Sequence, residues 1–277
     1  MFVFKDWEFL CRNLKNNNIY SISASNVLER KQGKSFCILK HDVETNPRKA
    51  LKLALIENKY GHCGSYYVQA YLLNKKENIK ILKQIASLGH EVTYHLDVMD
   101  HCKGDIVQAE KEFLNIISQF KGYGFQIKTV CQHGNPLMTR IGYHGNRDFF
   151  RNEQISIRYN QITEIMVNFR ERCYDKNYIY ISDAGYGWKI ISSPEDDDIP
   201  EKRIPNISIG NLDNVLSYIK SKSVIISTHP HRWCDSTMQA ICHDAVFFSV
   251  RKIAKLMIRI PIIRDIMKKN YHFAKKI

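Results

Sequence analysis

Short apolar runs alternate along the chain with longer stretches of helical period. Each run is five to seven residues long and rich in Ile, Val, Tyr and Thr, a composition typical of buried strands. The seven runs are SFCILKH (35–41), SYYVQA (65–70), EVTYH (91–95), QIKTVC (126–131), ITEIMV (162–167), YIYIS (178–182) and SVIIST (223–228). We therefore predict about seven strands.

Helical periodicity fills several of the gaps between these runs, at 47–60, 78–88 and 105–120. Gly61 and Gly89 stand just past the first two segments, where a left-handed glycine commonly ends a helix. Strand and helix in alternation predict parallel βαβ units, arranged as a barrel or as an open wound sheet.

Composition places this chain among globular intracellular proteins. It has 277 residues, 44% of them hydrophobic, enough to bury the core of one large domain or two small ones. Its eight cysteines include no C-x-x-C pair, which is typical of buried thiols in a cytosolic protein. Acidic Asp6 and Glu8 interrupt the N-terminal apolar stretch, and no uncharged segment reaches 18 residues. These features predict neither a signal peptide nor a membrane-spanning helix.

Positive charge is concentrated at the C-terminus. Residues 251–277 carry nine Lys or Arg against one acid, which is +8 of the total +13 and leaves +5 for the preceding 250 residues. Basic and apolar positions alternate here at close to helical spacing, which predicts a domain at 1–242 followed by a basic amphipathic helix at 243–277.

Three interpretations of this helix are open. It packs on the domain with its lysines in solvent, or residues 245–277 lie on an anionic membrane surface, which favours both apolar insertion and basic charge. Nucleic-acid binding is disfavoured, because no binding motif and no interleaved aromatic residues accompany the charge.

Ionisable residues follow several predicted strands directly. Four strands run into a histidine, at His41, His95, His133 and His229, and a fifth run precedes Asp183. The carboxyl ends of parallel strands meet on one face, where such folds place their chemistry. The sequence therefore predicts one polar site built from several strand ends.

Imidazoles and carboxylates at such a site suit zinc, with cobalt, nickel or manganese as alternatives. Asp42 and Glu44 are two residues apart, so in an extended segment they point to the same side. One could bind the metal while the other takes a proton from water, and a histidine could protonate the leaving group. These residue types together indicate metal-assisted hydrolysis.

Five short motifs occur in an order that resembles the polysaccharide deacetylase superfamily (NodB homology, carbohydrate esterase family four). The resemblance is to a branch with HDVD and HP-x-RW motifs that is linked to surface-polysaccharide synthesis, and it covers roughly residues 35–235. The motifs here are HDVE (41–44), GHEVTYH (89–95), QHGNP (132–136), SDAGYGW (182–188) and STHPHRW (227–233).

The resemblance implies a distorted (β/α)7 barrel with a divalent metal held by one Asp and two His. By position, Asp42 and Glu44 would supply the catalytic base and a metal ligand, His95 a second ligand, and His229 the general acid. Met99 stands where the family has its second histidine, and Val43 separates the two acids. A rearranged set, Asp42 or Glu44 with His95 and His133, is the metal site that this chain offers.

Further residues near the motifs are candidates for substrate binding. Trp188 and Trp233 could form a sugar-stacking wall or pack in the core, and Arg232 could clamp an anionic group or form a surface ion pair. Asp97 lies two residues after His95, within reach of the site. The complete set of substrate-binding candidates is His41, Asp97, Asp183, Trp188, Arg232 and Trp233.

The leading functional hypothesis is a metal-dependent hydrolase that removes an N-acetyl or related acyl group from a sugar. Its substrate would be a sugar or lipid-linked glycan of capsule or lipopolysaccharide synthesis, met in the cytoplasm at the inner face of the membrane. The alternative, motivated by Met99 and Val43, is an inactive barrel that binds glycan or serves an assembly. The sequence leaves the oligomeric state open.

Overall fold

The computed structural model describes residues 2–257, apart from 31, 34, 135–137, 139, 184, 193, 197, 198, 200, 201, 203, 211 and 221. Side chains at 212, 213, 250, 251 and 253–257 are also outside the description. Part of the predicted C-terminal helix, residues 258–277, therefore lies outside the described residues.

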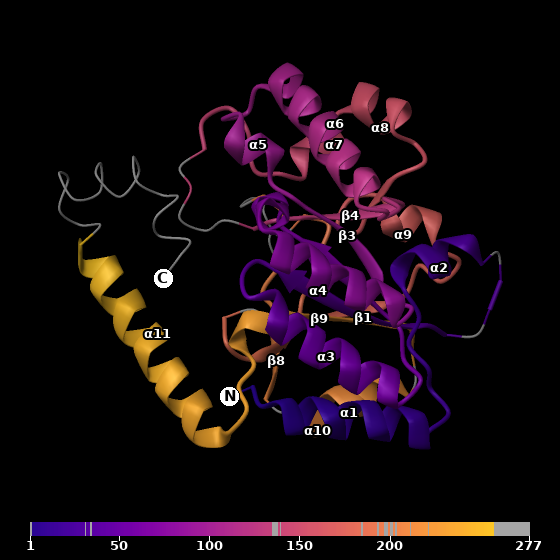
Figure 1. Ribbon diagram of the computed structural model, residues 1–277, viewed down its shortest axis with the longest axis vertical. Helices are drawn as coiled ribbons and strands as arrows, with labels where there is room; N and C mark the ends of the chain where they lie inside the picture. Colours follow the sequence, from indigo (N-terminus) through magenta and orange to yellow (C-terminus); the bar gives the residue numbers. More distant parts are fainter. Residues whose placement is uncertain are drawn as a thin grey trace.

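A nine-stranded sheet forms the centre of the molecule, in the order β5-β4-β3-β2-β1-β9-β6-β7-β8 (Figure 1). The seven predicted strands are confirmed, and all of them pair in parallel: β1 (Cys37–Val43), β2 (Gly64–Val68), β3 (Glu91–Leu96), β4 (Thr129–Gln132), β5 (Thr163–Glu164), β6 (Ile179–Ser182) and β9 (Val224–Thr228). Two further strands, β7 (Trp188–Ile190) and β8 (Ile207–Gly210), add an antiparallel edge. Within the described part of the chain no pairing joins β5 to β8, so a closed barrel is not seen there.

Helices fill the connections between the parallel strands. The three predicted helices are confirmed as α3 (Pro47–Lys59), α4 (Lys76–Ser87) and α6 (Ile106–Gly122). Gly61 and Gly89 have φ values of 79° and 90°, the left-handed conformation expected just after a helix end. The other helical segments are α1 (Phe4–Asn16), α2 (Ala24–Glu29), η1 (Ala70–Asn74), α5 (Val98–His101), α7 (Asp148–Arg151), α8 (Glu153–Arg158), α9 (Phe169–Arg172), α10 (Leu212–Ile219), η3 (Pro230–Arg232) and α11 (Thr237–Met257).

Strand β1 is buried along its whole length and presents alternate residues to two different layers. Leu39 packs with Trp7 of α1 and Leu53 of α3, on the helix-covered side. Ile38 packs on the other side with Tyr67, in a cluster that also includes residues of β4, β6 and β9. The polar residues that follow along β1 are sorted between these layers in the same way.

Helix α11 extends at the left of Figure 1, away from the helices that cover the sheet. It begins at Thr237, so the predicted boundary between residues 242 and 243 falls inside a continuous helix. Phe247 stacks on Tyr186 with ring centroids 4.0 Å apart, and His243 lies 5.9 Å from the same ring. No helix in the described ranges is both long and apolar enough to cross a membrane.

Candidate metal centre at the strand ends

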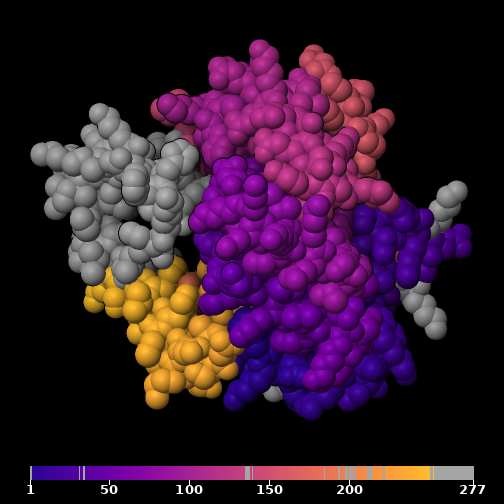
Figure 2. All heavy atoms as spheres, in the orientation of Figure 1, coloured from indigo at the N-terminus to yellow at the C-terminus, as the bar shows by residue number. Residues whose placement is uncertain are grey.

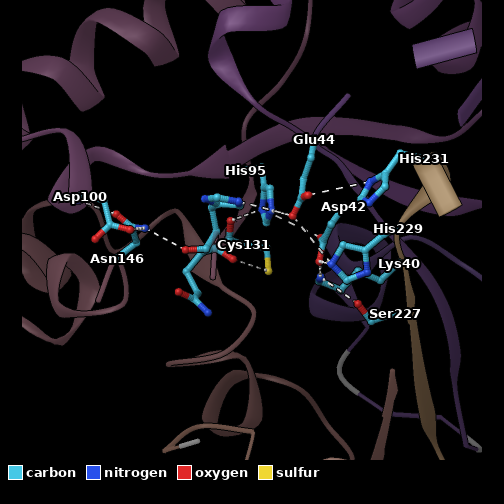
Figure 3. Close-up of polar contacts among 12 residues, drawn as sticks. Lys40, Asp42, Glu44, His95, Asp100, Cys131, Asn146, Ser227, His229 and His231 are labelled. Atoms are coloured by element: carbon cyan, nitrogen blue, oxygen red, sulfur yellow. Dashed lines mark hydrogen bonds and ion pairs between the residues drawn. The ribbon is translucent and has the colours of Figure 1, made fainter. Parts of the chain in front are cut away.

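The C-terminal ends of β1, β3, β4 and β9 bring their polar side chains together (Figure 3). Asp42 is the sixth residue of β1 and Glu44 follows its end, while His95 lies near the end of β3. His133 directly follows β4 and His229 directly follows β9. The β3–β4 register pairs His95 with Cys131, which leaves His133 just beyond the paired residues. Parallel pairing thus gathers side chains from distant parts of the sequence.

Glu44 is the centre of this arrangement. One of its carboxylate oxygens, Oε1, lies 3.4 Å from His133 Nε2, 3.9 Å from His95 Nε2 and 3.8 Å from His229 Nε2. Burial raises the pKa of Glu44, but the neighbouring His133 and His95 outweigh it and hold the pKa well below its usual range. The carboxylate is therefore ionised at neutral pH and faces three imidazole nitrogens from three strands.

Two of these imidazoles are oriented by hydrogen bonds on their other nitrogen. His95 Nδ1 lies 2.9 Å from the backbone oxygen of Cys131, which can only accept, so Nδ1 carries the proton. His229 Nδ1 lies 2.5 Å from Asp183 Oδ1, and the His229 backbone N–H donates to the other Asp183 oxygen at 2.9 Å. These bonds turn Nε2 of both rings towards the site, the orientation typical of metal-binding or acid–base histidines.

Asp42 is held from below by a buried lysine. Lys40 Nζ lies 2.5 Å and 2.7 Å from the two carboxylate oxygens and donates to Ser227 Oγ at 3.2 Å. Burial raises the pKa of Asp42, but Lys40, His95 and His229 together bring it below its ordinary value. Lys40 itself is 1% exposed, and the charge of Asp42 raises its pKa against the opposing effect of burial. The pair is ionised and its geometry is fixed.

Among the residues that the structure describes, two groups of side chains have metal-binding spacing, with ligand atoms within 4.8 Å of one another: Glu44, His95 and His133, or Asp42, His95 and Cys131. The first group fits a divalent ion better. Both imidazoles can offer Nε2 towards Glu44, and two histidines with one carboxylate are a known donor set of catalytic zinc. In the second group, Lys40 already engages Asp42, and burial raises the pKa of the Cys131 thiol well above its usual range.

Sequence reasoning missed Lys40, Ser227 and His231. His231 Nδ1 lies 3.9 Å from Glu44 Oε2 and has no hydrogen-bond partner in the described structure. Burial lowers the pKa of His231 to about 4, so its ring is neutral at neutral pH, with Nδ1 on the side of Glu44. For Lys40 the signal was the period of two, since it shares its face of β1 with Asp42. His231 lies in the turn η3 after β9, where that period does not apply.

His41 is not part of the site, so the prediction that it binds substrate is wrong. Its side chain is fully buried on the opposite face of β1, stacked on Tyr66 with ring centroids 4.3 Å apart. Its Nε2 lies 2.7 Å from Glu57 Oε1, and its Nδ1 lies 2.7 Å from Thr228 Oγ1. Odd and even positions of a strand face opposite ways, so His41 cannot accompany Asp42.

Trp188 and Trp233 lie in the core, which corrects their predicted role as a sugar-stacking wall. They are 6% and 1% exposed, and both indoles pack on Phe2. Trp233 also packs on Trp7 with ring centroids 5.1 Å apart. Since almost none of the Trp233 surface is accessible, its indole has no face to offer to a sugar.

The remaining candidates are engaged in contacts with the protein. Asp183 is fully buried between His229 and Arg232, whose Nη1 donates to Asp183 Oδ1 at 2.9 Å. Burial raises the pKa of Asp183, but these two partners hold it well below its ordinary value. Asp97 accepts a hydrogen bond from the Tyr94 hydroxyl at 2.7 Å and lies 3.4 Å from His101 Nε2. Arg232 and Asp183 thus support His229, and Asp97 bonds within its own segment.

No family model and no curated protein matches the chain. Among solved structures, it is similar to a family 4 carbohydrate esterase from Streptomyces lividans, determined in complex with acetate. The two share 13% sequence identity, with a TM-score of 0.41 over 80% of this chain and 91% of the esterase chain. A similarity at this level does not establish a shared activity.

Proposed function

We propose that the protein is a metal-dependent hydrolase that removes an N-acetyl or related acyl group from a sugar. One observation carries the proposal: Glu44 Oε1 is faced by the Nε2 atoms of His95, His133 and His229, at 3.4–3.9 Å. These separations are too long for ordinary hydrogen bonds and suit groups that share a ligand between them. The motif resemblance supplies the class of reaction.

Glu44, His95 and His133 are the proposed metal ligands. A divalent ion held there, zinc in the first instance, would supply a Lewis acid for a carbonyl oxygen and lower the pKa of a bound water. Met99 cannot serve as the missing ligand, because it is 3% exposed and packed in the hydrophobic core. We propose that His133, at the end of β4, is the second histidine ligand instead.

Asp42 is the proposed general base, and His229 the proposed general acid. Lys40 keeps Asp42 ionised and fixed, so that the carboxylate can accept a proton from the attacking water. His229 Nε2 lies 3.9 Å from Asp42 Oδ2, on the opposite side from its Asp183 partner. Asp183 stabilises the charged ring, and His229 gives its proton to the departing amine. In this proposal Asp42 takes the proton of the attacking water, and His229, protonated at the start of the reaction, supplies the proton of the departing amine.

The substrate in this proposal is a sugar or lipid-linked glycan of capsule or lipopolysaccharide synthesis, met in the cytoplasm at the inner face of the membrane. The motif resemblance supports this biology, and the concentration of basic residues at 251–277 supports the place. The competing proposal, an inactive glycan-binding barrel, is motivated by Met99 and Val43. A decayed site would have splayed side chains or an apolar filling, whereas the strand ends here present ionised and hydrogen-bonded groups.

The test is acetate release from a panel of N-acetylated sugars, oligosaccharides and nucleotide sugars by the full chain reconstituted with zinc, cobalt, nickel or manganese. We expect wild-type turnover on a member of the panel, lost in Asp42→Asn and His229→Gln. His144→Gln is the control, since the His144 side chain is 55% exposed and belongs to a different segment. Undiminished turnover in Asp42→Asn would contradict the assigned base, and glycan retention without turnover by the metal-loaded wild type would favour the inactive barrel.

A further inference from the structure

Helix α11 has apolar residues on two faces, and the body of the protein covers one of them. Ala240, which is 1% exposed, packs with Val3 and Cys234. One and two turns further along this face, His243 and Phe247 lie against Tyr186. This inward face accounts for the attachment of α11 to the domain.

The outward face is apolar as well. Met238, Ile241, Cys242, Ala245 and Phe248 follow the i, i+3, i+4, i+7 spacing of one helix stripe, and all are exposed. Phe248 lies at the edge of this stripe, since its ring centroid is also 5.9 Å from that of Tyr186. Met238 is 71% exposed, Ile241 50% and Phe248 49%. We call these five residues the outward stripe. Surface helices normally present polar side chains to water, so an uncharged outward face calls for a partner.

A dense positive charge follows the outward stripe in the sequence. Nine Lys or Arg and one acid occupy 251–277, whereas residues 237–250 contain no Lys or Arg and one acid, Asp244. Figure 2 shows α11 at the edge of the molecule, in orange and yellow. An apolar protein partner would use the stripe without needing the charge, and a nucleic acid would use the charge without needing the stripe. An anionic bilayer uses both, through apolar insertion and attraction of Lys and Arg to acidic headgroups.

We propose that the outward stripe of α11 docks the protein on an anionic lipid surface. Contacts of the inward face link α11 to the strand-end site. Phe247 stacks on Tyr186, and the Arg232 guanidinium lies 4.9 Å above the same tyrosine ring. Arg232 in turn holds Asp183, the partner of His229. The helix that carries the outward stripe therefore packs against a residue that also contacts the supports of His229. The inference concerns binding alone and does not depend on the proposed reaction.

The test is co-sedimentation of the full chain with vesicles of equimolar phosphatidylcholine and phosphatidylglycerol, beside vesicles of phosphatidylcholine alone. We expect binding to the anionic vesicles that weakens with added salt, and little binding to the neutral ones. Met238→Gln/Ile241→Gln should weaken binding about tenfold, because two inserted apolar side chains are lost. Ala245→Glu, which adds a negative charge to the same stripe, should weaken it as well.

The matched control is Leu114→Gln/Ile157→Gln, which removes two aliphatic side chains of α6 and α8 that are 50% and 66% exposed. It should bind like wild type, and all variants should keep the wild-type unfolding midpoint. Equal binding by the stripe variant and wild type, or no binding of wild type to anionic vesicles, would overturn the proposal. A wild-type dimer that the stripe variants convert to a monomer, without vesicle binding, would instead assign the stripe to self-association. Metal content, measured on the same samples, reports on the proposed hydrolase separately.

Discussion

The two faces of strand β1 carry two clusters of the same chemical type, a glutamate among histidines. Behind the strand, both oxygens of Glu57 are in close contact: Oε1 with His41 Nε2 at 2.7 Å and Trp7 Nε1 at 2.9 Å, and Oε2 with the Tyr66 hydroxyl at 2.9 Å. In front of it, the imidazoles around Glu44 Oε1 stop at 3.4–3.9 Å. Both oxygens of Glu57 thus have partners within 3 Å, whereas Glu44 Oε1 has none among the three imidazoles that face it.

This difference separates a structural network from a ligand site. Buried charges are tolerated when their partners satisfy them, and Glu57 is fully buried with such partners. An added Cβ at Gly64 would lie 2.9 Å from Glu57 Oε2, so the rear cluster is also closely enclosed. In the front cluster, Lys40 holds Asp42 and Asp183 holds His229, and neither of these partners lies between Glu44 and the imidazoles. Glu44 Oε1 and the Nε2 atoms that face it are therefore left for a ligand. Rear variants should therefore alter stability, and front variants should alter binding and turnover.

Substituting one histidine on each face of β1 should have the largest effects, on turnover for the front face and on stability for the rear face. His229→Gln should lower turnover by about 10²- to 10⁴-fold, the usual contribution of a general acid, with little change in the free energy of unfolding. His41→Gln should lower the free energy of unfolding and leave turnover per folded molecule unchanged. Steady-state kinetics and urea unfolding of both variants measure the two effects. A loss of stability in His229→Gln but not in His41→Gln would contradict the assignment of the front cluster to function and the rear cluster to stability.

Glu57→Gln should destabilise the fold by about 3–5 kcal/mol, because it removes one partner of a buried charged network. Urea unfolding measures the change. Metal content of the folded fraction should match wild type, since Glu57 lies behind the strand. Loss of metal without loss of stability would show that the rear cluster belongs to the site.

Lys40→Met should destabilise the protein by about 3 kcal/mol, because Asp42 is left buried without its main counter-charge. The double variant Lys40→Met/Asp42→Leu should recover most of that stability and still lack turnover. Urea unfolding of the two variants tests the pairing. A double variant as unstable as the single one would mean that the lysine acts through packing and not through Asp42.

The smallest effect is on acid unfolding. Burial raises the pKa of Glu57, but His41, His90 and its hydrogen bonds bring it below the ordinary value of 4.5. A carboxyl whose pKa is lowered in the folded state stabilises the fold above its unfolded value, and this contribution is lost as the pH falls through the folded value. The stability difference between wild type and Glu57→Gln should therefore shrink below pH 4.5. A stability difference between the two proteins that stays constant on acidification would contradict the lowered pKa of Glu57.

Local sequence patterns determined the strands, three helices and the strand-end histidines. Apolar run length identifies buried strands, and parallel pairing then brings His95 and His133 to one edge whatever their separation in the sequence. The period of two also contained the information that His41 and Lys40 lie on opposite faces of β1, but it has to be applied to every residue of the strand.

Other features depend on packing that no local pattern encodes. Trp233 has the same amphipathic character in a pocket wall and in a core, and only its contacts with Phe2 and Trp7 decide between them. The sequence grouped His133 with Glu44, but the β3–β4 register that brings His133 Nε2 to 3.4 Å from Glu44 Oε1 depends on the folded sheet. The open edge formed by β7 and β8 was likewise not predicted.

The central claim is that the front cluster holds a divalent metal and the rear cluster does not. The most direct measurement is elemental analysis of the zinc-reconstituted full chain, with His95→Ala and His133→Ala representing the front and His90→Ala the rear. The account predicts about one metal per chain in wild type and in folded His90→Ala, and a large loss in both front variants. Full metal content in His95→Ala and His133→Ala, or none in wild type, would contradict it.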